Sequence, residues 1–362
     1  MPSITRGTCY CIFVYDIAFS IDLNEAERRI SSAKRETIKH KRRAPQYFEY
    51  QPAPLGISQA AESVRIVESF VTDTQVELVV YDFGGVTVIY RVPLTGDSSR
   101  LLALSEGLYE NDQLLADSRR RVEDLLNFIR PAVSKANIST FVEDYSIFQV
   151  DGFAESTSVD ELLNRYGPQI AQILRAETRQ LSEDEVIDAL SYRISFGKDD
   201  VAIMDWNAAL VVDKEAEDVL TVLEFANVEL LEMRFLDQRL DDALGLAYDR
   251  LSKRSRNWLT FRSDLRDISQ WQVDSAVLFE GVNNVLKLLG DQYLARVYRL
   301  TAQRFHLNEW DASILRKLET LESIYQKISD QMVSRRMEVL EWIIIVLITI
   351  SIILPFISGG HR

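Results

Sequence analysis

The feature that constrains this chain most is an apolar run close to its C-terminus. Residues 342–357 read W-I-I-I-V-L-I-T-I-S-I-I-L-P-F-I and include no charged side chain. Counted from Val339, the run is about 19 residues long, close to the roughly 20 residues that a helix needs to cross the hydrocarbon core of a bilayer. We therefore predict one transmembrane helix over residues 339–358. The predicted anchor side chains are Trp342, Ile343, Ile344, Ile345, Val346, Leu347, Ile348, Ile350, Ile352, Ile353, Leu354, Phe356 and Ile357.

The same run has a second interpretation, as a β-branched core segment or a slightly short helix in the membrane interface. No polar face appears in it at helical spacing, which favours the spanning helix. Arg335 and Arg336 precede the run, and basic residues favour the inner side of a membrane. We predict a single-pass, tail-anchored protein of the bacterial inner (plasma) membrane with its bulk in the cytoplasm. The mitochondrial inner membrane is the alternative location.

Composition limits the class of protein and its partners. Of 362 residues, 47% are hydrophobic and 27% are charged, which is typical of a globular chain. The net charge of −14 disfavours nonspecific binding of nucleic acid by the whole molecule. A local exception is the basic run Lys39, Lys41, Arg42 and Arg43, which could contact lipid headgroups or RNA phosphates, or could be a solvated helix end. The cysteines, Cys9 and Cys11, are interpreted as small buried hydrophobic residues.

The N-terminal part alternates between strand-like and helix-like patterns. Predicted strands lie at residues 8–19, 76–81, 86–92 and 141–150, with helices after about residue 24 and residue 98. Asp82-Phe83-Gly84-Gly85 suits a hairpin turn between the second and third strands. The order βαββαβ predicts an α+β fold that begins with a ferredoxin-like domain, residues 1–152. A mixed connecting region is predicted for residues 153–213.

Long amphipathic stripes follow and predict a helical bundle or coiled-coil region over residues 214–338. The stripe before the apolar run keeps a regular step of four and three residues, as coiled-coil seams do. Such a seam usually packs against another helix, so we predict a homo-oligomer; packing within the chain is the alternative. The predicted seam consists of Ile314, Leu318, Leu321, Tyr325, Ile328 and Met332.

Evidence for a reaction is weak in this sequence. The acidic residues Asp199, Asp200, Asp205 and Asp213 surround a strand-like piece and could hold a divalent metal for hydrolase or nuclease chemistry. Their spacing fits no metal motif, and chance clusters are expected among 55 acidic residues. His306 stands beside Phe305 and Leu307, a setting more typical of a packed or capping histidine than of a general base. We predict neither a catalytic residue nor a cofactor.

The end of the chain resembles a known family. Residues 336–348 follow the pattern R-x-E-x-x-E-W-I-I-I-x-L-I, which is similar to the ending of the YagE-like family named for "required for meiotic nuclear division". The helical residues 223–241 and the turn at Asp82-Phe83-Gly84-Gly85-Val86 occupy matching places. Eukaryotic members are mitochondrial inner-membrane proteins that support organellar translation. The absence of a transit peptide here implies a bacterial member.

These observations predict a noncatalytic, membrane-anchored scaffold or adaptor whose cytoplasmic part self-associates or docks partners. The resemblance adds a protein or ribosome partner and support of translation at the membrane. The alternative is a membrane-attached metal-dependent hydrolase or nuclease that uses the acidic residues of 199–213.

Overall fold

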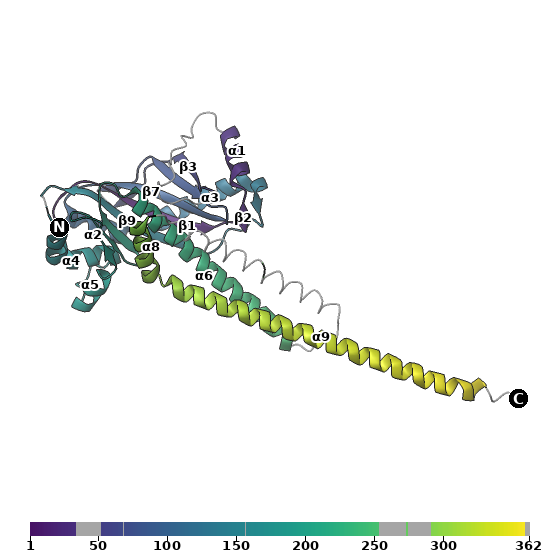
Figure 1. Ribbon diagram of the computed structural model, residues 1–362. Coiled ribbons are helices and arrows are strands. Elements are labelled where there is room, and N and C mark those ends of the chain that lie inside the picture. Colours follow the sequence, from purple (N-terminus) through teal and green to yellow (C-terminus); the bar gives the residue numbers. More distant parts are fainter. Residues whose placement is uncertain (34–51, 68, 156, 253–272, 274–290, 359–362) are drawn as a thin grey trace. The chain divides into compact units, whose positions relative to one another are not determined.

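The computed structural model describes residues 1–33, 52–67, 69–155, 157–252, 273 and 291–358 (Figure 1). The chain divides into two compact units, which we describe separately. The first is Met1–Leu236 with Leu278–Asp311, and the second is Asp237–Val277 with Ala312–Arg362. The domain boundaries predicted at residues 152, 213 and 338 stay predictions.

The described part of the first unit is built on an eight-stranded mixed sheet with the order β10-β11-β12-β9-β1-β7-β6-β3. Neighbouring strands are antiparallel except for β12 and β9, which run parallel. The strands are β1 (Ile4–Asp16), β3 (Leu55–Ala60), β6 (Gln75–Val80), β7 (Gly85–Gly96), β9 (Val142–Phe153), β10 (Arg193–Ile194), β11 (Val201–Met204) and β12 (Ala208–Val212). Shorter pairs are β2 (Ser20–Ile21) with β8 (Val133–Ser134) and β4 (Arg65–Val67) with β5 (Phe70–Val71).

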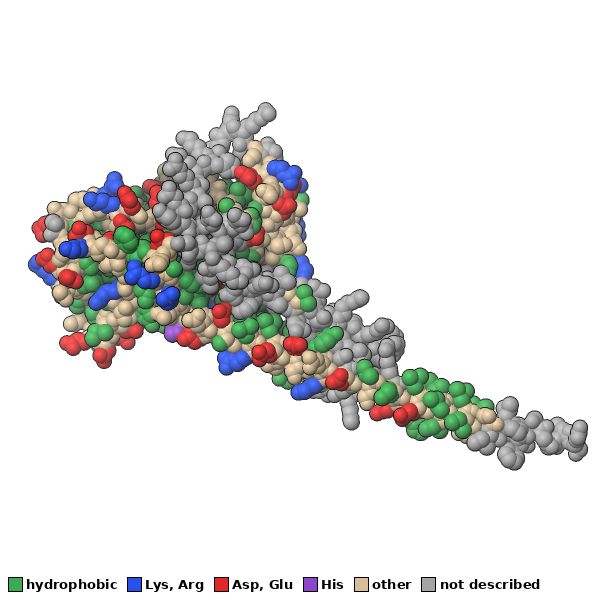
Figure 2. Space-filling view, in the orientation of Figure 1, with side chains coloured by type: hydrophobic (Ala, Val, Ile, Leu, Met, Phe, Trp, Pro, Cys, Tyr) green, Lys and Arg blue, Asp and Glu red, His purple; other side chains and the backbone are tan. Residues whose placement is uncertain are grey.

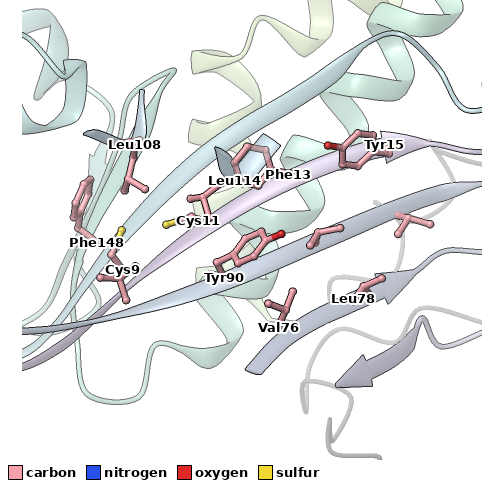
Figure 3. Close-up of a cluster of buried hydrophobic side chains, with 14 of the residues drawn as sticks. Cys9, Cys11, Phe13, Tyr15, Val76, Leu78, Tyr90, Leu108, Leu114 and Phe148 are labelled. Atoms are coloured by element: carbon pink, nitrogen blue, oxygen red, sulfur yellow. The ribbon is translucent and has the colours of Figure 1, made fainter. Parts of the chain in front are cut away.

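Strand β1 lies inside the sheet and is buried on both faces. Cys9 and Cys11 point to one face and join the large cluster of buried side chains in Figure 3. Ile12 and Val14 alternate with them and are also buried. A strand covered on both faces reads as a nearly continuous apolar run, because both sets of alternating side chains leave water. The interpretation of the cysteines as buried residues is confirmed.

Helices cover the face of the sheet that carries Cys9 and Cys11. Side chains of α1, α2, α3 and α4 belong to the same buried cluster as that face. Local capping fixes where several helices begin: Asn111 accepts a hydrogen bond from the backbone N of Leu114, and Ser158 and Ser182 cap their helices in the same way. The elements are α1 (Leu23–Ala33), η1 (Ser98–Arg100), α2 (Leu101–Leu108), α3 (Asp112–Ile129), η2 (Arg130–Ala132), α4 (Val159–Arg175) and α5 (Glu183–Ala189).

The opposite face is covered by α6 (Glu217–Ser252) and α8 (Gln292–Arg304). The ring of Phe225 in α6 lies 6.2 Å from that of Tyr81, directly after β6. Beside α8, the ring of Phe305 lies 5.4 Å from that of Tyr145 in β9. The first unit therefore has a sheet between two layers of helices, and its core extends on both sides of the sheet.

The turn between β6 and β7 requires glycine. Gly84 has φ +109°, and a Cβ at this position would lie 1.8 Å from the backbone O of Ala18. Both the left-handed backbone and the close approach exclude a side chain. The predicted hairpin is confirmed, since β6 pairs with β7 on either side of this turn.

The prediction of a ferredoxin-like fold is wrong. The sheet does not stop at the four predicted strands: β12, β11 and β10 continue it beyond β9, and β3 extends the other edge. β12 joins through parallel pairing with β9, from Ala208 opposite Ser146 to Val212 opposite Val150. The region predicted as a connecting segment thus supplies strands of the same sheet, because its short apolar runs are completed by long-range pairing.

The second unit contains the end of α6 and most of α9 (Leu307–Ser358). The two helices are joined by ion pairs: Nζ of Lys317 lies 2.7 Å from Oδ1 of Asp237 and 2.6 Å from Oδ1 of Asp241. Leu240 and Leu321 are fully buried in this unit. In this unit, α6 and α9 stabilise each other because each helix packs one apolar side against the other.

The prediction of a C-terminal membrane anchor is wrong. Among the described residues, no helix combines the length and apolar character that crossing a bilayer requires. Glu338 and Glu341 lie at the beginning of the predicted anchor, and charged side chains oppose burial in hydrocarbon. The predicted single-pass location in a bacterial inner membrane, with its mitochondrial alternative, is not supported on the same ground.

Candidate functional site

The C-terminal part of α9 exposes its apolar side chains. Trp342 is 66% exposed, Leu347 59% and Ile345 52%, although all lie in regular helix. Figure 2 shows hydrophobic side chains gathered over this part of the helix. We call these side chains the α9 apolar surface; they are Val333, Met337, Val339, Leu340, Trp342, Ile343, Ile344, Ile345, Val346, Leu347, Ile348 and Ile350.

Contiguous apolar patches of this kind mark interaction sites, because water is released when a partner covers them. Residues 342–348 of this surface are consecutive along the helix, so their apolar side chains point to every side of it. A continuous helix also presents them in a fixed geometry. The α9 apolar surface is therefore the strongest candidate for a functional site in the described part of the chain.

The predicted oligomer seam lies earlier in α9. Ile314 and Leu321 are fully buried, and Leu318 and Tyr325 are half-buried. The side chains of Ile328 and Met332 lie outside the described residues. This burial corresponds to the alternative of packing within the chain; as an oligomer seam, the stripe stays a prediction.

The acidic residues considered for metal binding are not brought together. Asp200 accepts hydrogen bonds from the backbone N of Phe196 (2.7 Å) and of Gly197 (2.5 Å) in the loop before β11. Asp213 accepts one from Glu215 N at 2.9 Å, and Asp199 is an exposed residue of the loop. In the described part of the chain, no group of acidic, histidine or cysteine side chains is arranged to hold a metal ion.

Asp205 has a different role, because two arginines hold it. It is fully buried, and its carboxylate receives Nε of Arg175 at 2.9 Å and Nε of Arg304 at 2.7 Å. Both arginines also contact Asp188 of α5. The network joins α4, α5, α8 and the turn between β11 and β12, and it leaves Asp205 without a position for a metal.

Two other predicted features have simple outcomes. His306 has φ +56° at the start of α9 and its side chain is 66% exposed, with Nδ1 3.5 Å from Oε1 of Glu309. Its backbone O accepts hydrogen bonds from the N atoms of Glu309 and Trp310, so His306 takes part in starting the helix.

The basic run Lys39, Lys41, Arg42 and Arg43 lies outside the described residues.

Sequence analysis did not find a set of buried carboxyl groups on α6. Glu224, Glu229 and Glu232 are each less than 5% exposed. The hydroxyl of Tyr81 donates to Glu224 at 3.4 Å, and that of Tyr298 in α8 donates to Glu229 at 2.6 Å. Burial raises the pKa of Glu229 to about 8 despite the hydrogen bond from Tyr298.

A fourth buried carboxyl, Asp16 at the end of β1, faces Glu232. Burial and the charge of Asp16 raise the pKa of Glu232 well above its ordinary value. Oε1 of Glu232 has no hydrogen-bond partner among the described residues. On the same side of the sheet, burial raises the pKa of Glu143 in β9 to about 7, although Arg234 of α6 forms an ion pair with it. Protonated carboxyl groups reduce the cost of burying α6.

The sequence carries one signal of this burial. Between residues 219 and 236, the apolar residues of α6 lie on all sides of the helix rather than in one stripe. A helix that is apolar all round is a buried helix. The glutamates within such a segment could therefore have been identified as buried.

Comparison with known proteins identifies relatives of the sheet-bearing region. The family described as "Uncharacterized protein MJ0711, N-terminal domain" matches residues 6–218. The chain is similar to the uncharacterized protein MJ0711 of Methanocaldococcus jannaschii, at 24% identity over 234 residues, which are 64% of this chain and 71% of that protein. No solved structure matches the chain.

The family match includes every strand of the large sheet except the first residues of β1. The ending that resembles the YagE-like family, residues 336–348, lies outside the matched range, and that resemblance stays a prediction. Because residues 6–218 are more than half of the 362 residues, the chain belongs to the family of the uncharacterized protein MJ0711, N-terminal domain.

Proposed function

We propose that the protein is a noncatalytic scaffold that docks another protein surface on α9. The observation that carries this proposal is the α9 apolar surface, whose side chains between Val333 and Ile350 are 49–66% exposed in a regular helix. When a partner covers such side chains, each Å² of apolar area removed from water contributes roughly 25 cal/mol of favourable free energy to binding. The surface is therefore suited to binding.

The sheet-bearing unit supplies the rigid body of the scaffold. Its core lies on both sides of the sheet, and the buried network of Arg175, Asp205 and Arg304 joins several elements. The aspartates that suggested hydrolase chemistry already have protein partners: Asp205 pairs with arginines, and Asp200 accepts backbone hydrogen bonds. These contacts support a structural role for them.

The test uses the full chain, with Leu340→Glu and Leu347→Glu combined in one variant. Both side chains are exposed, at 58% and 59%, so the substitutions leave the core intact. In gentle native extracts we expect the wild type to sediment in a complex larger than one chain, and the variant to sediment as a single chain. Exposed Glu322→Leu is the control for composition, because it lies on α9 outside the α9 apolar surface. A wild type that sediments as a single chain, or a variant that stays in the complex, contradicts the proposal.

Support of translation is carried only by the family resemblance. Its test is co-sedimentation of the purified full chain with ribosomes, with the Leu340→Glu/Leu347→Glu variant beside it. Loss of co-sedimentation in the variant would identify the ribosome as the docked surface.

A further inference from the structure

We propose that Asp16 and Glu232 form a buried proton-binding site, in which Glu232 carries the proton and Asp16 carries the negative charge. The site lies in the first unit and joins the end of β1 to α6. This inference goes beyond the docking function proposed for α9 and does not depend on it.

The strand pairing places the two carboxyl groups at the same end of the sheet. Asp16 is the last residue of β1 and lies opposite Gly85, the first residue of β7. Side chains alternate along a strand, so Asp16 shares its face with Val14 and points away from the Cys9 face, to the side that α6 covers. Oε1 of Glu232 lies 3.4 Å from the position that a Cβ of Gly85 would take. Glu232 therefore reaches the sheet beside Asp16.

The surroundings of this pair do not suit two ionised carboxylates. Asp16 is 3% exposed and Glu232 is 4% exposed, so water does not screen the repulsion between them. Oε1 of Glu232 accepts no hydrogen bond from the described residues. A positive charge at the pair removes the repulsion.

A proton fits the pair better than a metal ion does. In the described part of the chain, no group of three or more acidic, histidine or cysteine side chains is arranged to hold a metal. Hard metal ions take six or more oxygen ligands, whereas a proton needs only one carboxyl oxygen. The ligand of this site is therefore a proton.

The hydrogen bonds of the two carboxyl groups differ, and the difference assigns the proton to Glu232. Oδ1 of Asp16 accepts a hydrogen bond from the backbone N of Ala18 at 3.0 Å, which favours the ionised form of Asp16. Oε1 of Glu232 has no such donor, and a buried oxygen without a donor costs less in a neutral carboxyl than in a carboxylate. Burial and the charge of Asp16 raise the pKa of Glu232 in the same sense.

Other titratable groups packed against this part of α6 have partners of their own. The pairs are Tyr81 with Glu224, Tyr298 with Glu229, and Glu143 with Arg234. The adjoining turn adds Asp82, and the start of α9 adds Asp311. Both are acids, and negative charge favours the neutral form of Glu232.

Release of this proton at alkaline pH weakens the attachment of α6 to the sheet. The pKa of Glu232 is raised above 4.5, so its stabilising contribution is complete below pH 4.5 and is lost as the pH rises through the folded-state value. One proton changes the equilibrium constant of unfolding by up to about tenfold per pH unit.

Infrared spectroscopy of the full chain tests the site, because a neutral carboxyl has a carbonyl band that a carboxylate lacks. Glu232→Gln keeps the size of the side chain and removes the acid. We expect the wild type at pH 7 to show a neutral-carboxyl band that is lost in Glu232→Gln. In Asp16→Asn, this band should disappear at a lower pH than in the wild type, because the neighbouring negative charge is gone.

The matched infrared control is Glu217→Gln, an exposed glutamate at the start of the same helix. It should leave the neutral-carboxyl band unchanged. A band that is kept in Glu232→Gln and lost in Asp16→Asn would place the proton on Asp16 and overturn the assignment. A band of Glu232 that titrates at the same pH in the wild type and in Asp16→Asn would show that burial alone protonates Glu232, and the shared site would be wrong.

Urea unfolding of the same proteins gives a second measurement. The unfolding equilibrium constant of the wild type, divided by that of Glu232→Gln, should rise by up to about tenfold per pH unit between pH 5 and the pH at which the band disappears. Glu229 is present in both proteins, so its own titration cancels from the ratio. A ratio that stays constant over this range contradicts the proposal.

Discussion

The hydroxyl of Tyr298 in α8 donates a 2.6 Å hydrogen bond to Oε2 of Glu229 in α6. Glu229 is 2% exposed, so the pair connects two helices inside the protein. Burial raises the pKa of Glu229 from its ordinary value of 4.5 to about 8, and the negative charge of Asp311 adds to the effect. At neutral pH the folded protein keeps a proton on Glu229 that the unfolded chain releases.

This pair predicts that the free energy of unfolding falls as the pH rises from about 4.5 to about 8. The sign follows from the raised pKa: the stabilising contribution is complete below 4.5 and is lost as the pH passes through the folded-state value. One such group changes the free energy of unfolding by up to about 1.4 kcal/mol per pH unit. Urea unfolding between pH 5 and pH 8 measures it, and Glu229→Gln should flatten the curve. The exposed Glu309→Gln is the control; equal slopes in all three proteins would contradict the assignment.

Arg304→Met should destabilise the protein by about 2–4 kcal/mol, because it removes one of the partners of a buried carboxylate. Asp205 is fully buried, and Arg175 alone would then balance its charge. Chemical denaturation measures the loss. Arg299→Met lies on the same helix at an exposed position and should cost less than about 0.5 kcal/mol. A similar loss in both variants would show that the ion network does not stabilise the fold.

Gly84→Ala should destabilise the hairpin of β6 and β7 by roughly 2–4 kcal/mol. The new Cβ would meet the backbone O of Ala18 at 1.8 Å, in addition to the strain of φ +109°. Gly96→Ala is the matched control, because it also has a positive φ, +87°, but nothing lies within 4 Å of its Cβ. If the two variants lose equal stability in urea unfolding, the contact with Ala18 is unimportant and backbone strain explains both.

Leu321→Ala should cost about 2–4 kcal/mol, because Leu321 is fully buried and its loss leaves a cavity. Leu315→Ala removes the same atoms from a side chain that is 47% exposed on the same helix and should cost less than about 1 kcal/mol. Helix content followed during thermal unfolding, with the oligomeric state measured in parallel, distinguishes packing within the chain from the predicted oligomer seam. Dissociation of an oligomer by Leu321→Ala without loss of helix stability would favour the seam.

Several elements of the fold could be predicted from the sequence because their causes are local. The hairpin at Gly84 follows from turn chemistry, and the apolar runs of β1, β7 and β9 identify strands. The steps of four and three residues in α9 also follow from the sequence. The sequence does not show which other part of the protein covers each apolar surface.

The sheet could not be predicted in full, because its extension depends on pairing between distant residues. Ala208 opposite Ser146 begins the parallel pairing of β12 with β9, and parallel strands have no local turn that marks their partner. The predicted set of strands was therefore incomplete. The apolar run at Trp342 was assigned to a membrane by composition, although composition alone does not distinguish among the surfaces that can cover a helix.

The buried glutamates also show which features local sequence predicts and which depend on long-range contacts. Glu224, Glu229 and Glu232 lie in a segment that is apolar on all sides, which is the sequence signal of a buried helix. Only the tertiary structure shows that the hydroxyls of Tyr81 and Tyr298 reach Glu224 and Glu229. The sequence by itself determined the local elements through turns, caps and periodicity. The tertiary structure decided strand partners and the burial of charge, because both depend on contacts between residues far apart in the chain.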